Sequence, residues 1–292
     1  MDPIKAGLLA AILATGLLLA IAWYVAARRQ ATAHRPGWAD FLVGCVVTFF
    51  DTLGIGSFAP TTAALKLLRL APDELIPGTL IVGLAAASVL EGVIFIRSVA
   101  VSAVLLAAMI VAATVGAWFG AGVVVRLPRR AVQFSMGVAL LIAGSLFAAS
   151  NLGFGPPGGV ALGLDGWRFA LAVGTSFVLG ALMTVGIGMY APTMIVLALL
   201  GVHPLAAFPV MAGACALLQT VSGVRFVRTG WFAWGPALGL SLGALIGVPL
   251  AAFVVKSLPL ETLRWLVVAV VYYAAFAMLR SALSAVSRRP SA

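Results

Sequence analysis

The sequence predicts an all-α integral membrane protein built from two related halves that are inverted relative to each other. Its composition is the first reason, because 63% of the 292 residues are hydrophobic and only 9% are charged. Several apolar runs reach the ~20 residues that a helix needs to cross the hydrocarbon core of a bilayer. A repeated segment rich in Gly and Pro, and the distribution of the arginines, are the other two reasons.

The net charge of +10 does not indicate a nucleic-acid partner. The arginines lie in the joints between apolar runs, where they signal topology, and no basic stripe is interleaved with aromatic residues. Cys45 and Cys215 each lie inside an apolar segment without a C-x-x-C partner. We therefore expect neither a disulfide framework nor a metal site, and no cofactor. The expected partners are the lipid bilayer and a small molecule, and the oligomeric state stays open.

The first apolar run covers residues 6–26 and is followed by Arg28 and Arg29. A cleaved signal peptide is one interpretation. The run is longer than a usual signal-peptide core, its leading end has no net positive charge, and arginines follow it. These features favour a transmembrane helix with an external N-terminus, so residues 1–37 form an N-terminal helix and a cytoplasmic joint.

A repeated segment divides the remaining chain. "GIGSFAPT" at residues 54–61 matches "GIGMYAPT" at residues 186–193, and the register continues for about a hundred residues. Matching pairs further along are Pro72 with Pro204, Pro77 with Pro209, Ser88 with Thr220 and, after a slip of one residue, Gly116 with Gly247. An ordered set of this kind indicates two homologous repeats. The predicted units are repeat 1 at 38–150, an external loop at 151–167, and repeat 2 with a short tail at 168–292.

Each repeat contains an apolar piece, the glycine break, a short apolar piece and three long runs. In repeat 1 these lie near 40–53, 58–70, 75–96, 98–125 and 130–149. Pieces of ~13 residues reach only ~20 Å as helix, which is too short to span the membrane separately. They can form one broken helix that crosses, or a re-entrant hairpin that returns to its own side.

The lysines and arginines favour hairpins. With hairpins, each repeat crosses three times, the repeats are inverted, and the cytoplasmic joints hold thirteen of the eighteen basic residues. If the pieces cross instead, the best division is ten against eight. The positive-inside rule therefore predicts seven full spans plus two re-entrant elements, with a cytoplasmic C-terminus in the cell inner membrane.

The two breaks are the predicted substrate site. Interrupted helix at membrane depth is tolerated where it is buried in protein or lines a wet cavity, and paired interruptions in inverted repeats mark transport sites. Ser57 is expected to cap the second short helix, and two converging helix N-termini would favour an anion. The alternative is that Gly and Pro only kink the helices and allow close packing. The predicted substrate-binding residues are Gly54, Gly56, Ser57, Phe58, Pro60, Thr61, Gly186, Gly188, Tyr190, Pro192, Thr193 and Gln219. Phe58 and Tyr190 are either gates or ordinary packing residues.

Two acids are candidates for a coupling role. Asp51 lies ~16 Å into its apolar piece at 1.5 Å per residue, and repeat 2 has Met183 there. It either carries a coupling proton or accepts hydrogen bonds at the break. Glu91 is expected nearer the external end of its run, where pairing with Arg97 or snorkelling is favoured over chemistry.

Two further classes of function follow from single residues. Ser57 and His203 suggest an intramembrane hydrolase as one alternative function. Such an enzyme needs a nucleophile and a base in contact. Met189 replaces Ser57 in repeat 2, and His203 belongs to an external turn, so we expect no enzyme. A cation- or proton-coupled carrier of a neutral solute would instead make the acids the site, and only Asp51 is expected to lie deep.

The two G-x-G-x-aromatic-A-P-T breaks, each followed by an L-L-x-hydrophobic-x-P turn, resemble the TauE/SafE family, also called the toluene-sulfonate uptake permease family. The resemblance covers nearly the whole chain after residue 36. It implies secondary transport of sulfur-containing anions such as sulfonates, sulfoacetate, sulfite or thiosulfate, with Gly54, Gly56, Pro60, Gly186, Gly188 and Pro192 as the glycine-rich breaks. Asp51 has no partner in repeat 2, and direction and substrate stay open.

Overall fold

The described part of the chain is helical. The computed structural model describes residues 2–29, 35–123, 129–154, 159–183 and 189–284. Within these ranges the only strand-like pairing is a single parallel bridge between Ala161 and Val202. The helices are α1 (Pro3–Arg29), α2 (Trp38–Thr52), α3 (Phe58–Leu67), α4 (Ile76–Ser98), α5 (Ala103–Val123), α6 (Arg129–Asn151), α7 (Gly166–Met183), α8 (Tyr190–Leu199), α9 (Ala207–Thr229), α10 (Trp234–Ser257) and α11 (Leu260–Ser284), with the 3₁₀ helices η1 (Asp73–Leu75) and η3 (Pro204–Ala206).

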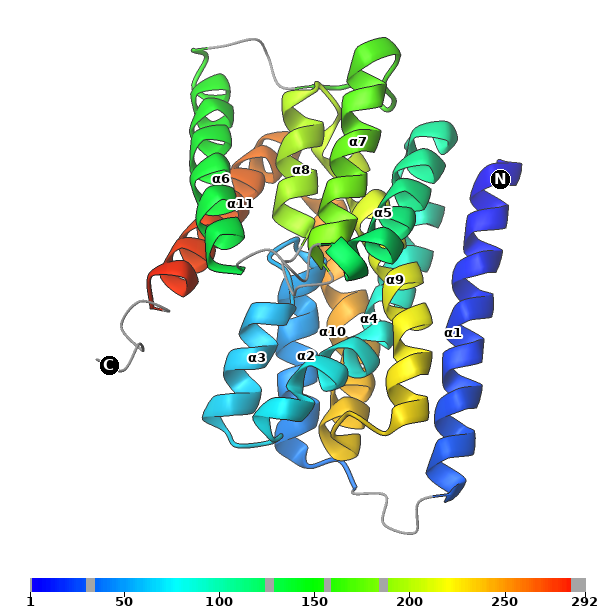
Figure 1. The fold of residues 1–292 in the computed structure, drawn as a ribbon. Coiled ribbons are helices and arrows are strands. Elements are labelled where there is room, and N and C mark those ends of the chain that lie inside the picture. Colours follow the sequence, from blue (N-terminus) through cyan, green and yellow to red (C-terminus); the bar gives the residue numbers. More distant parts are fainter. Residues whose placement is uncertain (1, 30–34, 124–128, 155–158, 184–188, 285–292) are drawn as a thin grey trace.

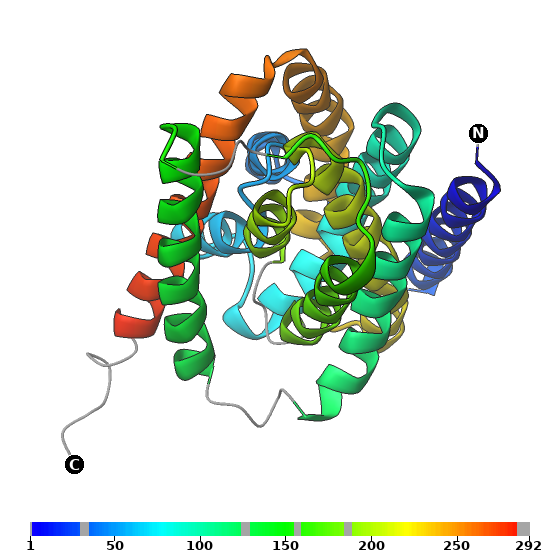
Figure 2. The same cartoon turned by 90° about the horizontal axis from the view of Figure 1, so that it is seen from above.

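Six helices in these ranges are long and apolar enough to cross a membrane. They cover Pro3–Arg28, Ile76–Ser98, Gly166–Met183, Pro204–Thr229, Trp234–Val255 and Arg264–Leu283. The prediction of an all-α, multi-pass membrane protein is confirmed at this level. The first of these helices, α1, lies at the edge of the bundle (Figures 1 and 2). The spans of α4 and α9 are the most deeply buried, so this pair forms the centre of the molecule.

Two pairs of short helices interrupt the long ones. The 15-residue α2 and the 10-residue α3 meet at residues 53–57. The 18-residue α7 and the 10-residue α8 form the second pair. In Figure 1 the first pair occupies the lower half of the molecule and the second pair the upper half. The observed bounds agree closely with the apolar pieces that the sequence predicts in repeat 1.

The α7–α8 pair begins and ends at one end of the molecule. The Ala161 N–H, just before α7, donates to the Gly201 carbonyl (3.2 Å), and the His203 N–H donates to the Ala161 carbonyl (2.8 Å). Gly201 and His203 follow α8, so the two helices return the chain to its starting side. The first residue of α9, Ala207, is at this same end.

The α2–α3 pair lies toward the opposite end of α9. Leu65 of α3 packs in one buried cluster with Ile76 of α4 and Ala233, which follows α9. The start of α2 contacts the start of α10, because Gly239 lies against Asp40. The two short-helix pairs therefore approach the core from opposite ends of the 23-residue α9.

Small residues allow the main helix pairs to pack backbone to backbone, as is usual in membranes. A Cβ added to Gly116 of α5 would overlap the Phe177 carbonyl of α7, and one added to Gly247 of α10 would overlap the Cys45 carbonyl of α2. The Ser176 hydroxyl of α7 also donates to the Met109 carbonyl of α5 (2.8 Å). These contacts hold α2 against α10 and α7 against α5.

Candidate functional site

Gly54 ends α2 and brings the first break against α8. Its φ of +98° is in the left-handed region, which L side chains rarely adopt. The Gly54 N–H donates to the Asp51 carbonyl (2.7 Å) and the Ile55 N–H to the Phe50 carbonyl (3.2 Å), a glycine-terminated helix end. A side chain here would also overlap the Met194 Cε of α8. Gly56, with φ of +88°, has open space where its Cβ would lie.

Ser57 occupies the N-cap position of α3 but does not cap the helix with its side chain. Its backbone is helical, with φ −85° and ψ −28°, and no side-chain cap hydrogen bond forms. The expected cap is therefore wrong, because Ser57 bonds to Asp51 through its hydroxyl and its N–H. Pro60 lies in the first turn of α3, as expected, and the Thr61 hydroxyl donates to the Ser57 carbonyl (2.7 Å).

Asp51 is buried in the last turn of α2, with 3% of its surface exposed. It accepts the two hydrogen bonds from Ser57, so the acid closes the loop between α2 and α3. Asp51 was expected either to carry a coupling proton or to accept hydrogen bonds at the break. Its observed contacts are hydrogen bonds at the break. A carboxylate at the start of α3 is also favoured by the helix dipole.

Glu91 lies at the junction of the two short-helix pairs. It is fully buried in α4, its Oε1 lies 2.7 Å from the Thr52 hydroxyl at the end of α2, and its Oε2 accepts from the Tyr190 hydroxyl at the start of α8 (2.6 Å). The expected pairing with Arg97 or snorkelling is therefore wrong, because Glu91 is buried and its partners are Thr52 and Tyr190. Arg97 follows Glu91 by six residues, and residues at that spacing do not share a helix face.

Tyr190 connects the second break to the centre of the molecule. Besides its bond to Glu91, its hydroxyl interacts with the thiol of Cys215 on α9. Cys215 Sγ also lies 3.9 Å from Met183 Sδ at the end of α7. Pro192 lies in the first turn of α8. Gly186 and Gly188, the predicted glycines of this break, lie outside the described residues.

Three polar side chains near the breaks are buried and have atoms without a protein hydrogen-bond partner. They are Thr193 (Oγ1), Gln219 (Oε1) and Ser88 (Oγ). Gly92 of α4 lies against Ala216 of α9, whereas Gly78 lies against Trp231, so the two helices are antiparallel. This arrangement brings Ser88 and Gln219 to the same level. Buried polar atoms without a partner are rare in proteins and indicate candidate ligand contacts.

Phe58 packs as an ordinary core residue. It is partly buried against the central hydrophobic cluster and against the smaller cluster that contains Leu65 of α3. Its contacts fit the packing interpretation. Sequence reasoning missed the Glu91 contacts, although an acid well inside a 23-residue apolar helix is the signal that could have identified them.

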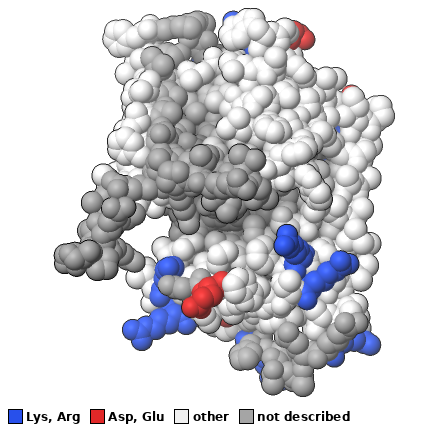
Figure 3. All heavy atoms as spheres, viewed as in Figure 1, with Lys and Arg blue, Asp and Glu red and all other residues white. Residues whose placement is uncertain are grey.

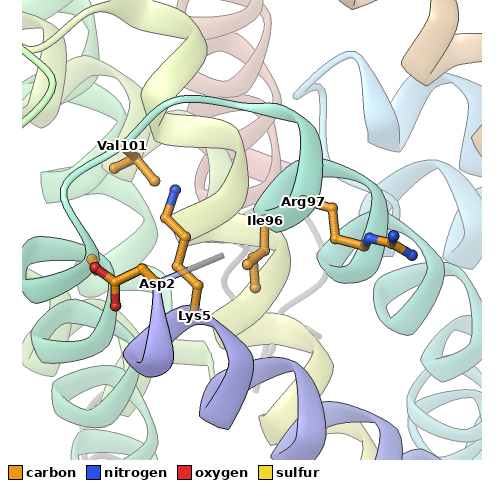
Figure 4. Close-up of a pocket in the computed structure, with 6 residues that line it drawn as sticks. Asp2, Lys5, Ile96, Arg97 and Val101 are labelled. Carbon is orange, nitrogen blue, oxygen red and sulfur yellow. The ribbon is translucent and has the colours of Figure 1, made fainter.

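A surface hollow lies away from the breaks, between the start of α1 and the turn from α4 to α5. It has a volume of about 470 Å³ and is lined by Asp2, Lys5, Ile96, Arg97, Val101 and Ala103. Figure 4 shows Lys5 extending toward Val101, whereas Arg97 points away. The Lys5 ammonium lies 3.5 Å from the Val99 carbonyl. None of the predicted site residues lines this hollow.

The pair required for a hydrolase is not brought together. Ser57 lies beside Asp51, whereas His203 follows α8 at its far end and caps η3 by accepting from the Leu205 N–H (3.1 Å). Burial, followed by the charge of Arg264, lowers the pKa of His203 from 6.5. Among the described residues, no group of three or more His, Cys, Asp or Glu side chains is arranged to hold a metal ion.

No protein-family model matches the chain, and no curated protein and no solved structure matches it either. The resemblance to the TauE/SafE family therefore depends on the motif residues alone.

Proposed function

We propose that this protein is a secondary transporter of small sulfur-containing anions and holds its substrate between the two helix breaks. The observation that carries the proposal is the meeting of both breaks at one buried carboxyl group. Glu91 contacts Thr52 at the end of α2 and Tyr190 at the start of α8. Paired helix interruptions that converge inside a membrane bundle are typical of transporter substrate sites. The sulfur-anion class, with sulfonates, sulfoacetate, sulfite and thiosulfate as members, comes from the motif resemblance.

Two inverted repeats are part of the proposal. Under the register of the sequence repeat, Gly116 corresponds to Gly247 and Phe177 to Cys45. The Gly116–Phe177 and Gly247–Cys45 backbone contacts are therefore equivalent. The helix pairs support the same relation, since α2 packs on α10 as α7 packs on α5, while α4 packs on its own counterpart α9.

The proposed topology has an external N-terminus, seven spans, two re-entrant pairs and a cytoplasmic C-terminus in the cell inner membrane. One observation supports this topology: the α2–α3 pair and the α7–α8 pair approach α9 from opposite ends. On the face in Figure 3, Lys and Arg gather in the lower part of the molecule, where the topology places the cytoplasm.

Cysteines introduced at Lys66 and His203 should react with impermeant reagents from opposite sides, and labelling of both from one side would contradict inverted repeats.

The N-termini of α3 and α8 and the unpartnered polar atoms support an anionic substrate. Both helices begin at the junction of the breaks, where their dipoles favour negative charge. The Thr193 hydroxyl is a buried donor in the first turn of α8. Gly56 leaves its neighbourhood open, so a ligand can approach the backbone there.

A cation- or proton-coupled carrier of a neutral solute is the second candidate. Its support is the position of Asp51, whose carboxyl group already binds the Ser57 N–H at the start of α3. A free anion would have to share this helix end with Asp51. An ionised acid at the junction also brings negative charge, which neutral or cationic cargo tolerates better than a bare anion.

Binding and flux measurements distinguish these candidates. Thermal-shift titration of the purified protein should show stabilisation by sulfite, thiosulfate, sulfoacetate or an aromatic sulfonate, because a ligand that binds only the folded state stabilises it. Sugars and zwitterionic taurine serve as controls of similar size. Stabilisation by sugars alone would contradict the anion proposal.

In proteoliposomes, Asp51→Asn should abolish the pH dependence of uptake if Asp51 carries the proton, and unchanged pH dependence would leave it a structural role.

A further inference from the structure

We infer that Glu91 holds a proton in this conformation and that Asp51 is its ionised partner, so that the two buried acids form a site for one exchangeable proton. This protonation state follows from the contacts around Thr52 and Glu91. Its coupling to substrate movement rests on the proposed transport function. Neither the composition nor the motif resemblance assigns a proton to Glu91.

Thr52 makes more hydrogen-bond contacts than its one hydrogen can supply. Its Oγ1 lies 2.7 Å from the Thr48 carbonyl oxygen and 2.7 Å from Glu91 Oε1. Both distances are those of full O–H···O hydrogen bonds. The carbonyl is only an acceptor, and a threonine hydroxyl carries one hydrogen. If Thr52 donates to Thr48, as hydroxyls in helices commonly do, the contact with Glu91 requires a hydrogen on Oε1.

The second oxygen of Glu91 agrees with this assignment. Oε2 accepts from the Tyr190 hydroxyl at 2.6 Å. A protonated carboxyl group can donate from one oxygen and accept at the other, whereas an ionised one only accepts. The neutral acid therefore satisfies Thr52 and Tyr190 together.

Asp51 has the contacts of the ionised member. Two donors of Ser57, its N–H and its hydroxyl, point to this carboxyl group. The charges of Asp51 and Glu91 act on each other inside the protein. Two like charges that interact in a site of low dielectric do not both persist, and one of them takes up a proton.

Other ionisable groups lie on the helices packed around α4, and Arg225 and Arg228 of α9 are exposed near the end of that helix. Tyr190 of α8 donates to Glu91, and Cys215 of α9 interacts with Tyr190. Helix α1 faces α4 where Gly16 meets Val89, and its own ionisable residues lie near its two ends. Helix α3 carries Lys66 in its last turn, α10 carries Lys256 at its last turn, and Arg97 is exposed in the last turn of α4.

Release of this proton has a structural consequence. The O–H bond of Glu91 breaks, the proton passes to water, and the electron pair stays on Oε1. Thr52 then has one hydrogen for two acceptors, so either its bond to Thr48 or its bond to Glu91 is lost. The bond to Thr48 lies within α2, whereas the bond to Glu91 joins α2 to α4. Proton release would therefore change the hydrogen bonding at the end of α2, beside the proposed substrate site.

Infrared spectroscopy of the full-length protein in lipid nanodiscs tests the assignment directly. At neutral pH the wild type should show the C=O stretch of a protonated, buried carboxylic acid, and Glu91→Gln should lack it. The glutamine is a matched substitution, since its amide can donate to Thr52 and accept from Tyr190. Absence of the band from the wild type, or its persistence in E91Q, would overturn the inference.

A second variant tests whether Thr52 accepts the hydrogen bond from the protonated Glu91. Thr52→Val keeps the shape of the side chain and removes its hydroxyl, so the Glu91 band should remain and move to higher wavenumber. An unmoved band would contradict the proposed Glu91-to-Thr52 bond.

Anion flux in proteoliposomes is measured separately, and flux through E91Q should lose the pH dependence of the wild type. If wild type carries no sulfur anion, the proposed function fails while the infrared result still decides the protonation of Glu91.

Discussion

The short helices that follow the two breaks are alike, but the residues before them differ in chemistry. Both helices have ten residues, begin with an aromatic residue and carry Pro in the first turn. The first break holds Asp51 and Ser57, bonded to each other, whereas Met183 and Met189 occupy the corresponding buried positions of the second. The comparison shows that two similar short helices can follow breaks of different chemistry, with a bonded acid and serine at the first and methionines at the second.

Glu91 adds to this asymmetry. It comes from α4, and the corresponding residue of α9 is Gly223, which packs against Leu19 of α1. One carboxyl group therefore serves both breaks, through Thr52 from the first and Tyr190 from the second. Substitutions at matching positions test how far the two halves of the chain are equivalent.

The largest expected effect is at Gly54. Gly54→Ala combines left-handed backbone strain with overlap against Met194, so we expect a loss of about 2–5 kcal/mol of stability. Gly56→Ala is the control, since its φ is also positive but its surroundings are open, and backbone strain alone should cost about 1–2 kcal/mol. Thermal unfolding measures both. Equal losses would mean that contact between the two breaks contributes little.

The next test compares the two backbone contacts that we propose to be equivalent. Gly116→Ala and Gly247→Ala each place a methyl group against a carbonyl of the facing helix, and each should lose about 1–3 kcal/mol. Gly174→Ala has no atom within reach of its Cβ and serves as a helix control. Destabilisation by one of the two substitutions without the other would break the symmetry of the packing.

A smaller effect is expected where the short helices end. Arg69 after α3 has φ of +53°, and Gly201 holds the corresponding position after α8 with φ of +92°. Because glycine favours this conformation, Arg69→Gly should stabilise by up to about 1 kcal/mol and Gly201→Ala should destabilise by about as much. Unfolding temperatures measured in parallel decide the matter, and a loss with Arg69→Gly would show that its side chain contributes more than its backbone costs.

The smallest expected effect is a pH dependence confined to the second half. Burial and Arg264 lower the pKa of His203 below 6.5, so the folded protein binds this proton less readily than the unfolded chain. The contribution of neutral His203 is therefore complete above pH 6.5 and is lost as the pH falls below that value. His203→Asn should remove this acid-dependent loss in thermal unfolding between pH 7.5 and 5, values chosen to bracket the histidine range. The corresponding residue of the first half is Ala71, which does not titrate. An unchanged pH profile in the variant would assign the loss elsewhere.

Much of the helical organisation could be predicted because its causes are local. Apolar runs and Gly and Pro interruptions placed α2 and α3 near their observed bounds, since helix ends depend on residues such as Gly54 and Pro60. The position of Glu91 could not be predicted in the same way. Its neighbour Arg97 favoured a local pair, whereas its partners Thr52 and Tyr190 lie 39 and 99 residues away.

Ser57 illustrates the same limit at short range. Its residue type and position predicted a helix cap, and local chemistry would permit one. The buried carboxyl group of Asp51 bonds its hydroxyl and N–H instead, because an acid removed from water requires hydrogen-bond donors.

The sequence by itself determined that this is a helical membrane protein with two similar interrupted segments, because hydrophobic length and glycine or proline breaks act through the local backbone. Only the tertiary structure decided that the first break meets the start of α8 at Glu91, and that Asp51 bonds to Ser57. Those contacts depend on which helix faces come together, and helix packing brings together residues from four separate segments of the chain.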